Sequence, residues 1–149
     1  KGVKYFVLVG MNEDGEPYEV FAGKNGFLDR GIATGRIIRK RQGFYKAVFD
    51  DDDETELAPI TASTDEHEEI ITRLTSALLR SGASMHLVVQ QLERVGGEMQ
   101  GFSKSVARSL KKYIKDGTKE GVQCLECVGD LIRQEGCIAC KSCVFSKCA

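Results

Sequence analysis

The residues best suited to chemistry are six cysteines close to the C-terminal end of the chain. All six lie between positions 124 and 148, and the first 123 residues contain none. A disulfide-stapled secreted domain distributes its cysteines through the fold, because each bridge has to close a different loop. Cysteines clustered at CxxC spacing instead indicate metal binding or thiol redox work in a reducing compartment. We therefore expect a cytoplasmic protein with a zinc-and-thiol module at this end.

The cysteine spacing favours zinc as the metal. Zinc takes four soft ligands in a tetrahedron, and a CxxC turn places two thiolates on one side of the ion. Residues 131–139 predict a hairpin with its turn at Glu135-Gly136. A zinc ribbon has one CxxC before such a hairpin and the other just after its return strand. This arrangement favours four metal ligands, which are Cys124, Cys127, Cys140 and Cys143.

A second choice of ligands is also compatible with the spacing. If Cys137 and Cys140 form the second pair, Cys143 and Cys148 are left over. In the favoured assignment the surplus thiols are Cys137, on the return strand, and Cys148, the penultimate residue beside Lys147. Nearby positive charge lowers a thiol's pKa, and exposure lets the thiolate attack another disulfide. We interpret the surplus pair as redox-active.

The first 116 residues predict the domain that positions this module. Apolar and β-branched segments at 4–11 and 18–23 flank an Asp-Gly turn, and segments 35–42 and 44–49 flank Gly43, so two antiparallel hairpins are expected. Three helices should follow. The first has Ser63 and Glu66 at capping-box spacing and should end at Gly82 in a left-handed cap. The second starts at Ser84, and the third spans about 102–114.

The helices should bury one apolar face each. Residues recurring at helical spacing in the first helix are Ile70, Ile71, Leu74, Ala77 and Leu78. The second helix is expected to turn Leu87, Val88 and Leu92 inward, and the third Phe102, Val106, Leu110 and Ile114. We read 117–123 as a linker and 124–149 as the cysteine-rich ribbon and tail. The fold class is thus α+β with a zinc-ribbon-like appendage.

Composition excludes several other classes of protein. The net charge is −1, whereas a protein that binds nucleic-acid phosphates normally has a basic excess. No apolar run is long enough to span a bilayer. The acidic run 50–56 is expected to be a solvated loop, because like charges repel. The chain begins at Lys1 without a methionine, which we interpret as a piece of a longer polypeptide.

The sequence resembles the C-terminal end of a ribonucleotide reductase catalytic subunit, most closely the adenosylcobalamin-dependent class II type. The stretch 135–148 is similar to that family's cysteine-rich tail, and Cys124-Leu-Glu-Cys127 to its first knuckle. Residues 13–21 resemble the hairpin beyond the catalytic barrel, and 74–95 and 102–114 the helices that follow. The family's knuckles commonly read CPxCG, but here the prolines are replaced by Leu125 and Lys141 and the glycines by Val128 and Val144. Looser knuckle turns are expected from the missing glycines.

The resemblance implies a specific role for the surplus thiols. In such a reductase each turnover leaves a disulfide in the barrel, and the tail reduces it by exchange before thioredoxin or glutaredoxin re-reduces the tail. Adenosylcobalamin and the substrate would bind to the barrel. Nothing in this chain matches the radical-forming or substrate-binding residues, so the chain alone is not expected to reduce a nucleotide.

Two other functions fit part of the sequence. One is a non-catalytic zinc ribbon that contacts protein or nucleic acid, supported by scattered basic residues: Arg36, Arg39, Lys40, Arg41, Lys111 and Lys112. The other is a structural dock in which zinc only stabilises the end of the chain. A redox tail has two fast thiols beyond the zinc ligands, whereas the other two functions need none.

Overall fold

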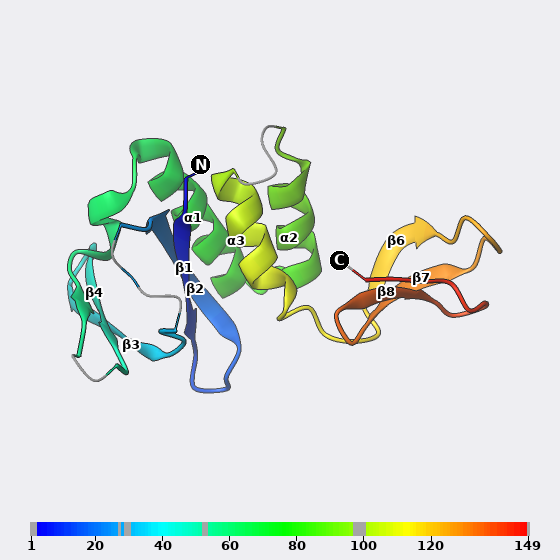
Figure 1. Ribbon diagram of the computed structural model, residues 1–149, viewed down its shortest axis with the longest axis horizontal. Helices are drawn as coiled ribbons and strands as arrows, with labels where there is room; N and C mark the ends of the chain where they lie inside the picture. Colours follow the sequence, from blue (N-terminus) through cyan, green and yellow to red (C-terminus); the bar gives the residue numbers. More distant parts are fainter. Residues whose placement is uncertain (1–2, 27, 29–30, 52–53, 97–100, 149) are drawn as a thin grey trace.

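The computed structural model of the chain describes residues 3–26, 28, 31–51, 54–96 and 101–148. Two small antiparallel sheets and three α-helices form the N-terminal part, and a four-stranded antiparallel sheet follows at the C-terminal end (Figure 1). The predicted α+β class, with two hairpins, three helices and a ribbon-like appendage, is confirmed.

The first hairpin is the centre of the N-terminal part. β1 (Tyr5–Met11) pairs antiparallel with β2 (Pro17–Lys24). The Asn12 side chain accepts hydrogen bonds from the N–H groups of Asp14 and Glu16, which closes the turn between the strands. Side chains alternate between the two faces of a strand, so this hairpin can contribute to a core on each side.

Each face of the first hairpin does cover a separate apolar core. One face contributes Val20 and Ala22, which pack with residues of the second and third helices. The opposite face contributes Phe6, which packs with residues of the second sheet and the following turn: Ala47, Phe49, Leu57 and Ile60. Because successive side chains point to opposite faces, the hairpin lies between the helices on one side and the second sheet on the other.

The second sheet contains β3 (Gly35–Arg41), β4 (Phe44–Phe49) and the short β5 (Glu56–Leu57), in that order. β5 includes Glu56, the last residue of the acidic run that was expected to be a loop. The side chain of Asp51 accepts from both the N–H and the hydroxyl of Thr55. The prediction of a loop is therefore wrong for Glu56, and Asp52 and Asp53 lie outside the described residues.

The cap of the first helix lies two residues later than predicted. Residues Ile60–Ser63 form a 3₁₀ turn, η1, and α1 (Glu66–Arg80) starts after Asp65. Asp65 and Glu68 form the capping box, with hydrogen bonds of 2.9 and 3.1 Å between each side chain and the other residue's N–H. The cap predicted at Ser63 and Glu66 is wrong because Ser63 is used in the 3₁₀ turn.

α1 presents the opposite face to the one its apolar periodicity suggests. Its buried residues are polar: Glu68, Thr72, Thr75 and Ser76. The Ser76 hydroxyl accepts from the Val20 N–H at 2.9 Å, which fixes the helix on β2. Ile70, Leu74 and Leu78 are exposed to solvent. Ile71 and Leu79 of the same helix are half-buried and pack against the core formed with α2 and α3. The helix is thus held by hydrogen bonds to the sheet and by these two residues, whereas Ile70, Leu74 and Leu78 face outward.

The other two helices pack against one another and against the hairpin. α2 (Met85–Arg94) is capped by Ser84, as predicted, and α3 (Phe102–Lys111) stacks Phe102 edge-on against Tyr5 with ring centroids 5.3 Å apart. The predicted core positions of α3 are buried, with Ile114 just beyond the helix end. Leu87 is exposed, so its predicted inward position is wrong; Val88 and Leu92 are buried as expected.

The C-terminal sheet has the strand order β6 (Lys119–Gln123), β7 (Asp130–Gln134), β8 (Cys137–Cys140) and β9 (Ser146–Lys147). Residues 119–123, within the segment interpreted as a linker, form a strand that pairs with β7. A buried ion pair joins Arg133 to Glu120 at 2.9 Å across these two strands. We refer to residues 119–148 as the ribbon.

Among the described residues, no helix combines the length and the apolar character needed to cross a membrane.

Candidate metal centre and redox thiol pair

The ribbon is built around a tight hairpin. β7 pairs antiparallel with β8, and Glu135 and Gly136 form the turn with φ angles of 49° and 81°. Two consecutive residues with positive φ are the mark of a type I′ turn, whose twist matches that of the flanking strands. The turn lies where the sequence predicts it. The hairpin places one CxxC before β7 and the other at the end of β8.

Four cysteine sulfurs meet at one end of this hairpin. The Sγ atoms of Cys124, Cys127, Cys140 and Cys143 all lie within 4.8 Å of one another. Cys124 and Cys143 are 3.7 Å apart, and Cys127 and Cys140 are 3.4 Å apart. Each CxxC thus contributes one sulfur to each close pair, and the two pairs come from segments on either side of the hairpin.

The sulfur positions fit a tetrahedral metal ion. Four thiolates at about 2.3 Å from zinc lie about 3.8 Å from one another at the corners of a tetrahedron. The Cys124–Cys143 and Cys127–Cys140 separations differ from this value by no more than a few tenths of an ångström. Four thiolates and no oxygen or nitrogen ligand form the soft donor set that zinc prefers. The four-cysteine cluster can therefore hold a metal such as zinc.

Backbone N–H groups support the sulfurs, although the usual glycines are missing. The Glu126 N–H donates to Cys124 at 3.4 Å, and the Ser142 N–H donates to Cys140 at 3.3 Å. Hydrogen bonds of this kind favour the thiolate form that binds metal. The expected loosening of the turns is wrong at these two sulfurs, because each knuckle still aims an N–H at its first cysteine.

Val128 takes the backbone conformation that glycine would adopt in the first knuckle. Its φ is 61°, in the left-handed region that is unfavourable for a β-branched residue. Gly129 follows it, and a Cβ there would lie 2.6 Å from the Ser142 hydroxyl and 3.2 Å from the Cys140 sulfur. The two knuckles therefore approach closely at Gly129, while the strain is carried by Val128.

Replacing Val128 by glycine should strengthen the ribbon. The left-handed conformation costs about 1–2 kcal/mol for a residue with a Cβ, and Val128→Gly removes this cost with little loss of packing because the side chain is exposed. We expect the zinc affinity, measured by competition with a chelator, to rise several-fold. Gly129→Val is the matched opposite change and should lower the affinity; equal affinities for all three proteins would contradict the assignment of strain.

The sulfurs differ in how easily they ionise in the metal-free protein. The Ser142 N–H bonded to Cys140 is the largest influence that lowers the pKa of this thiol to about 7. At Cys143 a hydrogen bond from the Phe145 N–H lowers the pKa of the thiol. Burial and the neighbouring thiols outweigh this bond and raise the pKa to about 12. Cys140 is thus available as a thiolate at a lower pH than Cys143.

This order predicts the alkylation pattern of metal-free protein with the Cys137–Cys148 disulfide intact. At pH 7 about half of Cys140 is ionised, because its pKa is about 7, whereas Cys143 remains protonated. The thiolate is the nucleophile, so iodoacetamide should modify Cys140 at least about tenfold faster than Cys143, with a rate that levels off above pH 7. Mass spectrometry of time points identifies the sites, and faster labelling of Cys143 would contradict the assignment.

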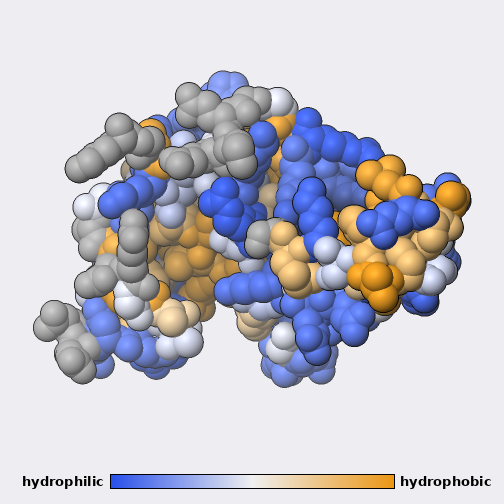
Figure 2. All heavy atoms as spheres, turned by 45° about the vertical axis from the view of Figure 1, so that its right-hand side comes forward, coloured by the Kyte–Doolittle hydropathy of each residue, from blue (hydrophilic) through white to orange (hydrophobic). Residues whose placement is uncertain are grey.

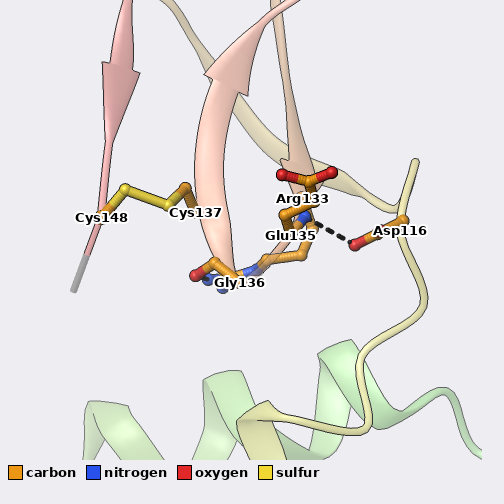
Figure 3. The surroundings of a disulfide bond; sticks show 6 residues. All are labelled: Asp116, Arg133, Glu135, Gly136, Cys137 and Cys148. Carbon is orange, nitrogen blue, oxygen red and sulfur yellow. Dashed lines mark hydrogen bonds between the residues drawn. A yellow bond between two sulfur atoms is a disulfide. The ribbon is translucent and has the colours of Figure 1, made fainter.

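The remaining two cysteines form a disulfide at the other end of β8. Cys137, the first residue of β8, is bonded to Cys148, which follows β9 (Figure 3). Figure 3 shows the bridge between β8 and the terminal strand. The structure thus joins the pair left over from the favoured ligand set and does not bring Cys143 to Cys148. Cys143 lies in the sulfur cluster.

The two sulfur groups are separated by the length of one strand. Cys140 pairs with Leu131 and Cys137 with Gln134, so the cluster and the disulfide lie at opposite ends of β8. Three residues of extended chain span about 10 Å. The disulfide can therefore open and close without removing a sulfur from the four-cysteine cluster.

A network of hydrogen bonds anchors the disulfide end of the ribbon to the segment after α3. The Gly117 N–H donates to the Arg133 carbonyl at 2.7 Å, and the Glu135 N–H donates to the Asp116 carboxylate at 3.0 Å (Figure 3). The Gln90 side chain of α2 reaches the Glu120 carbonyl at 3.3 Å. The spacing of the cysteines carries no signal for these contacts, nor for the buried Arg133–Glu120 pair.

The chain is thus an α+β domain that carries a four-cysteine ribbon closed by a disulfide. A family model described as the NrdJ homologue C-terminal domain matches residues 1–115. The chain therefore belongs to the NrdJ homologue C-terminal domain family, and NrdJ is the class II ribonucleotide reductase. The match covers the two sheets and three helices and ends before the cysteines. No curated protein and no solved structure is significantly similar to the chain.

Proposed function

We propose that this chain is the C-terminal redox region of a class II-type ribonucleotide reductase. Cys137 and Cys148 carry electrons from thioredoxin or glutaredoxin to the active-site disulfide of the catalytic barrel. Cys124, Cys127, Cys140 and Cys143 hold a structural zinc ion. Adenosylcobalamin, the nucleotide and the radical-forming residues belong to the barrel, in the same or a separate chain.

The observation that carries this proposal is the division of six cysteines into two groups. Four sulfurs form a compact cluster, and the other two form a disulfide adjacent to the chain end. A structural zinc site alone uses four thiolates. The extra pair, able to form a disulfide in the folded ribbon, is what an electron relay needs and what a structural ribbon lacks. The family match of residues 1–115 supports the reductase context.

The relay is a pair of thiol–disulfide exchanges. The thiolate of one reduced cysteine attacks the barrel disulfide, forms a mixed disulfide and releases one barrel thiolate, which takes a proton. The second cysteine then attacks the mixed disulfide, which releases the other barrel thiol and closes the Cys137–Cys148 bond. Two electrons and two protons pass to the barrel, and a thioredoxin or glutaredoxin dithiol restores the pair by the same two steps.

A bound zinc would supply a cross-link between the two knuckles. The chain's own contribution is the position of the thiol pair: Cys137 lies on a paired strand, whereas Cys148 follows the two-residue β9. β9 pairs with β8 through only Ser146 and Lys147. Opening of the disulfide therefore leaves Cys148 held only through the two paired residues of β9, which allows its sulfur to reach a separate disulfide.

A coupled assay tests the relay. The oxidised, zinc-loaded chain is mixed with catalytic thioredoxin, thioredoxin reductase and excess NADPH. We expect one NADPH to be consumed per chain with no loss of zinc, since a single disulfide is reduced. No consumption, or consumption only with release of zinc, would contradict the proposal.

A second candidate function is a zinc ribbon that docks on another protein. It is favoured by two apolar side chains at the knuckles, Leu125 and Val144, which are 95% and 98% exposed. Figure 2 shows hydrophobic surface gathered at the end of the ribbon. Exposed apolar groups of this kind occur at protein interfaces. Leu125→Ser together with Val144→Ser should leave the coupled assay unchanged if these residues serve docking alone.

A further inference from the structure

The outward face of α1 carries a continuous apolar stripe, which we define as Ile70, Leu74 and Leu78. The three residues are four apart and therefore lie in one row along the helix. Their exposed fractions are 46%, 61% and 44%. Single exposed apolar residues are common, but three in a row on one helix face are typical of a surface that is covered by another helix.

The stripe cannot be buried by rotation of α1 within the same chain. The opposite face is fixed to β2 by the Ser76 hydroxyl, which accepts from the Val20 N–H at 2.9 Å and can donate to the Val20 carbonyl at 3.2 Å. Glu68, also on that face, is part of the capping box that starts the helix. Rotation would break the Ser76–Val20 hydrogen bonds and leave buried polar groups of α1 and β2 without partners, which is unfavourable. The stripe therefore stays on the outer face of α1, where a second surface can cover it.

The charges beside the stripe are arranged with opposite signs at its two ends. Glu66 lies in the first turn of α1 and Arg80 in the last, with acidic residues elsewhere in the first turn. Glu66 and Arg80 are about four helical turns apart and so lie on the same flank of the stripe. Leu74, the most exposed of the three apolar residues, is at the middle of the row.

We propose that the stripe is covered by the same stripe of a second copy of this chain, with the two α1 helices antiparallel around a twofold axis near Leu74. This arrangement places apolar residues on apolar residues. It also brings Glu66 of each copy next to Arg80 of the other, which gives two ion pairs related by symmetry. A self-complementary patch is what a twofold interface requires. The dimer is a property of α1 and does not depend on the redox role of the ribbon.

Sedimentation of the 149-residue chain over a range of concentrations tests the dimer. We expect a reversible monomer–dimer equilibrium, and we expect Leu74→Arg to remain monomeric at concentrations where the native chain is mostly dimeric. Arginine is a good helix former, so circular dichroism should show an unchanged fold. Val122→Arg is the matched control, since Val122 on β6 is 60% exposed, and it should dimerise normally. A native chain that stays monomeric throughout would overturn the proposal.

Charge reversal tests the antiparallel orientation. Arg80 also contacts Glu19 at 3.1 Å, so the folding of each variant is checked by its thermal melting. Glu66→Arg and Arg80→Glu should each weaken self-association severalfold, because both place like charges together at the two ends. An equal mixture of the two variants should restore dimerisation as a heterodimer. A mixture that associates no better than its components would exclude the antiparallel pairing and place a different occupant on the stripe.

Discussion

Replacing Cys148 by serine is expected to abolish electron transfer through the ribbon while leaving the metal centre intact. Cys148 is bonded to Cys137 and is separated from the four-cysteine cluster by the length of β8. Without it, Cys137 can form a mixed disulfide but cannot resolve it. In the assay with thioredoxin, thioredoxin reductase and NADPH, consumption should fall from one NADPH per chain to none, with one zinc per chain retained.

Cys137→Ser is the matched variant, because it removes the other sulfur of the same disulfide. Cys137→Ser should also end NADPH consumption, because a relay needs both thiols. Cys143→Ser distinguishes the two ligand assignments: it should lower the zinc content if Cys143 belongs to the metal cluster. Full zinc binding by Cys143→Ser, together with zinc loss from Cys137→Ser, would show that the alternative pairing is the correct one.

The second large effect is expected at Cys124. It is the one buried member of the four-cysteine cluster among the described residues, and its sulfur lies 3.7 Å from that of Cys143. Serine offers a hard oxygen that does not replace a thiolate. Changes outside the ligand shell already lower metal affinity about 10- to 100-fold, so Cys124→Ser should lower zinc affinity by more than about 100-fold in a chelator competition.

In the reduced chain, where the Cys137–Cys148 disulfide no longer joins the two ends of the sheet, loss of zinc should unfold the ribbon and spare the rest of the chain. The ribbon has few buried apolar residues, chiefly Leu131 beside Cys124, whereas the two cores around β1 and β2 contain many. Small metal domains draw most of their folding free energy from the ion. Hydrogen exchange of Cys124→Ser should therefore show fast exchange in β6–β8 and native protection in α1–α3. Loss of protection throughout the chain would contradict this expectation, and so would unchanged protection in the ribbon.

The ribbon was the part most readable from sequence because its chemistry is local. Two CxxC turns must face each other to bind one ion, and Glu135-Gly136 marks the hairpin between them. Spacing and hairpin together favoured four of the six sulfurs but left a second ligand set open, and the structure brings the favoured four together. The disulfide partner of Cys137 followed only from the choice of ligand set. The left-handed Val128 was not foreseeable, since a valine at that position gives no signal of the conformation that the knuckle imposes on it.

The helical half shows where sequence periodicity is insufficient. The spacing of Ile70, Leu74 and Leu78 correctly predicts a helix, but periodicity does not say which face meets the sheet. That choice was made by polar groups, chiefly Ser76, which hydrogen-bonds to the backbone of β2. The cap moved to Asp65 for a related reason, because a 3₁₀ turn uses Ser63 and delays the start of α1.

The most direct test of the account is a zinc measurement combined with thiol counting on freshly reduced, metal-loaded protein. We predict one zinc per chain and two rapidly titrating thiols, which mass spectrometry should identify as Cys137 and Cys148. These two should re-form one disulfide on oxidation, with zinc retained. One zinc per chain with no fast thiol pair would contradict the redox role and leave a structural or docking ribbon.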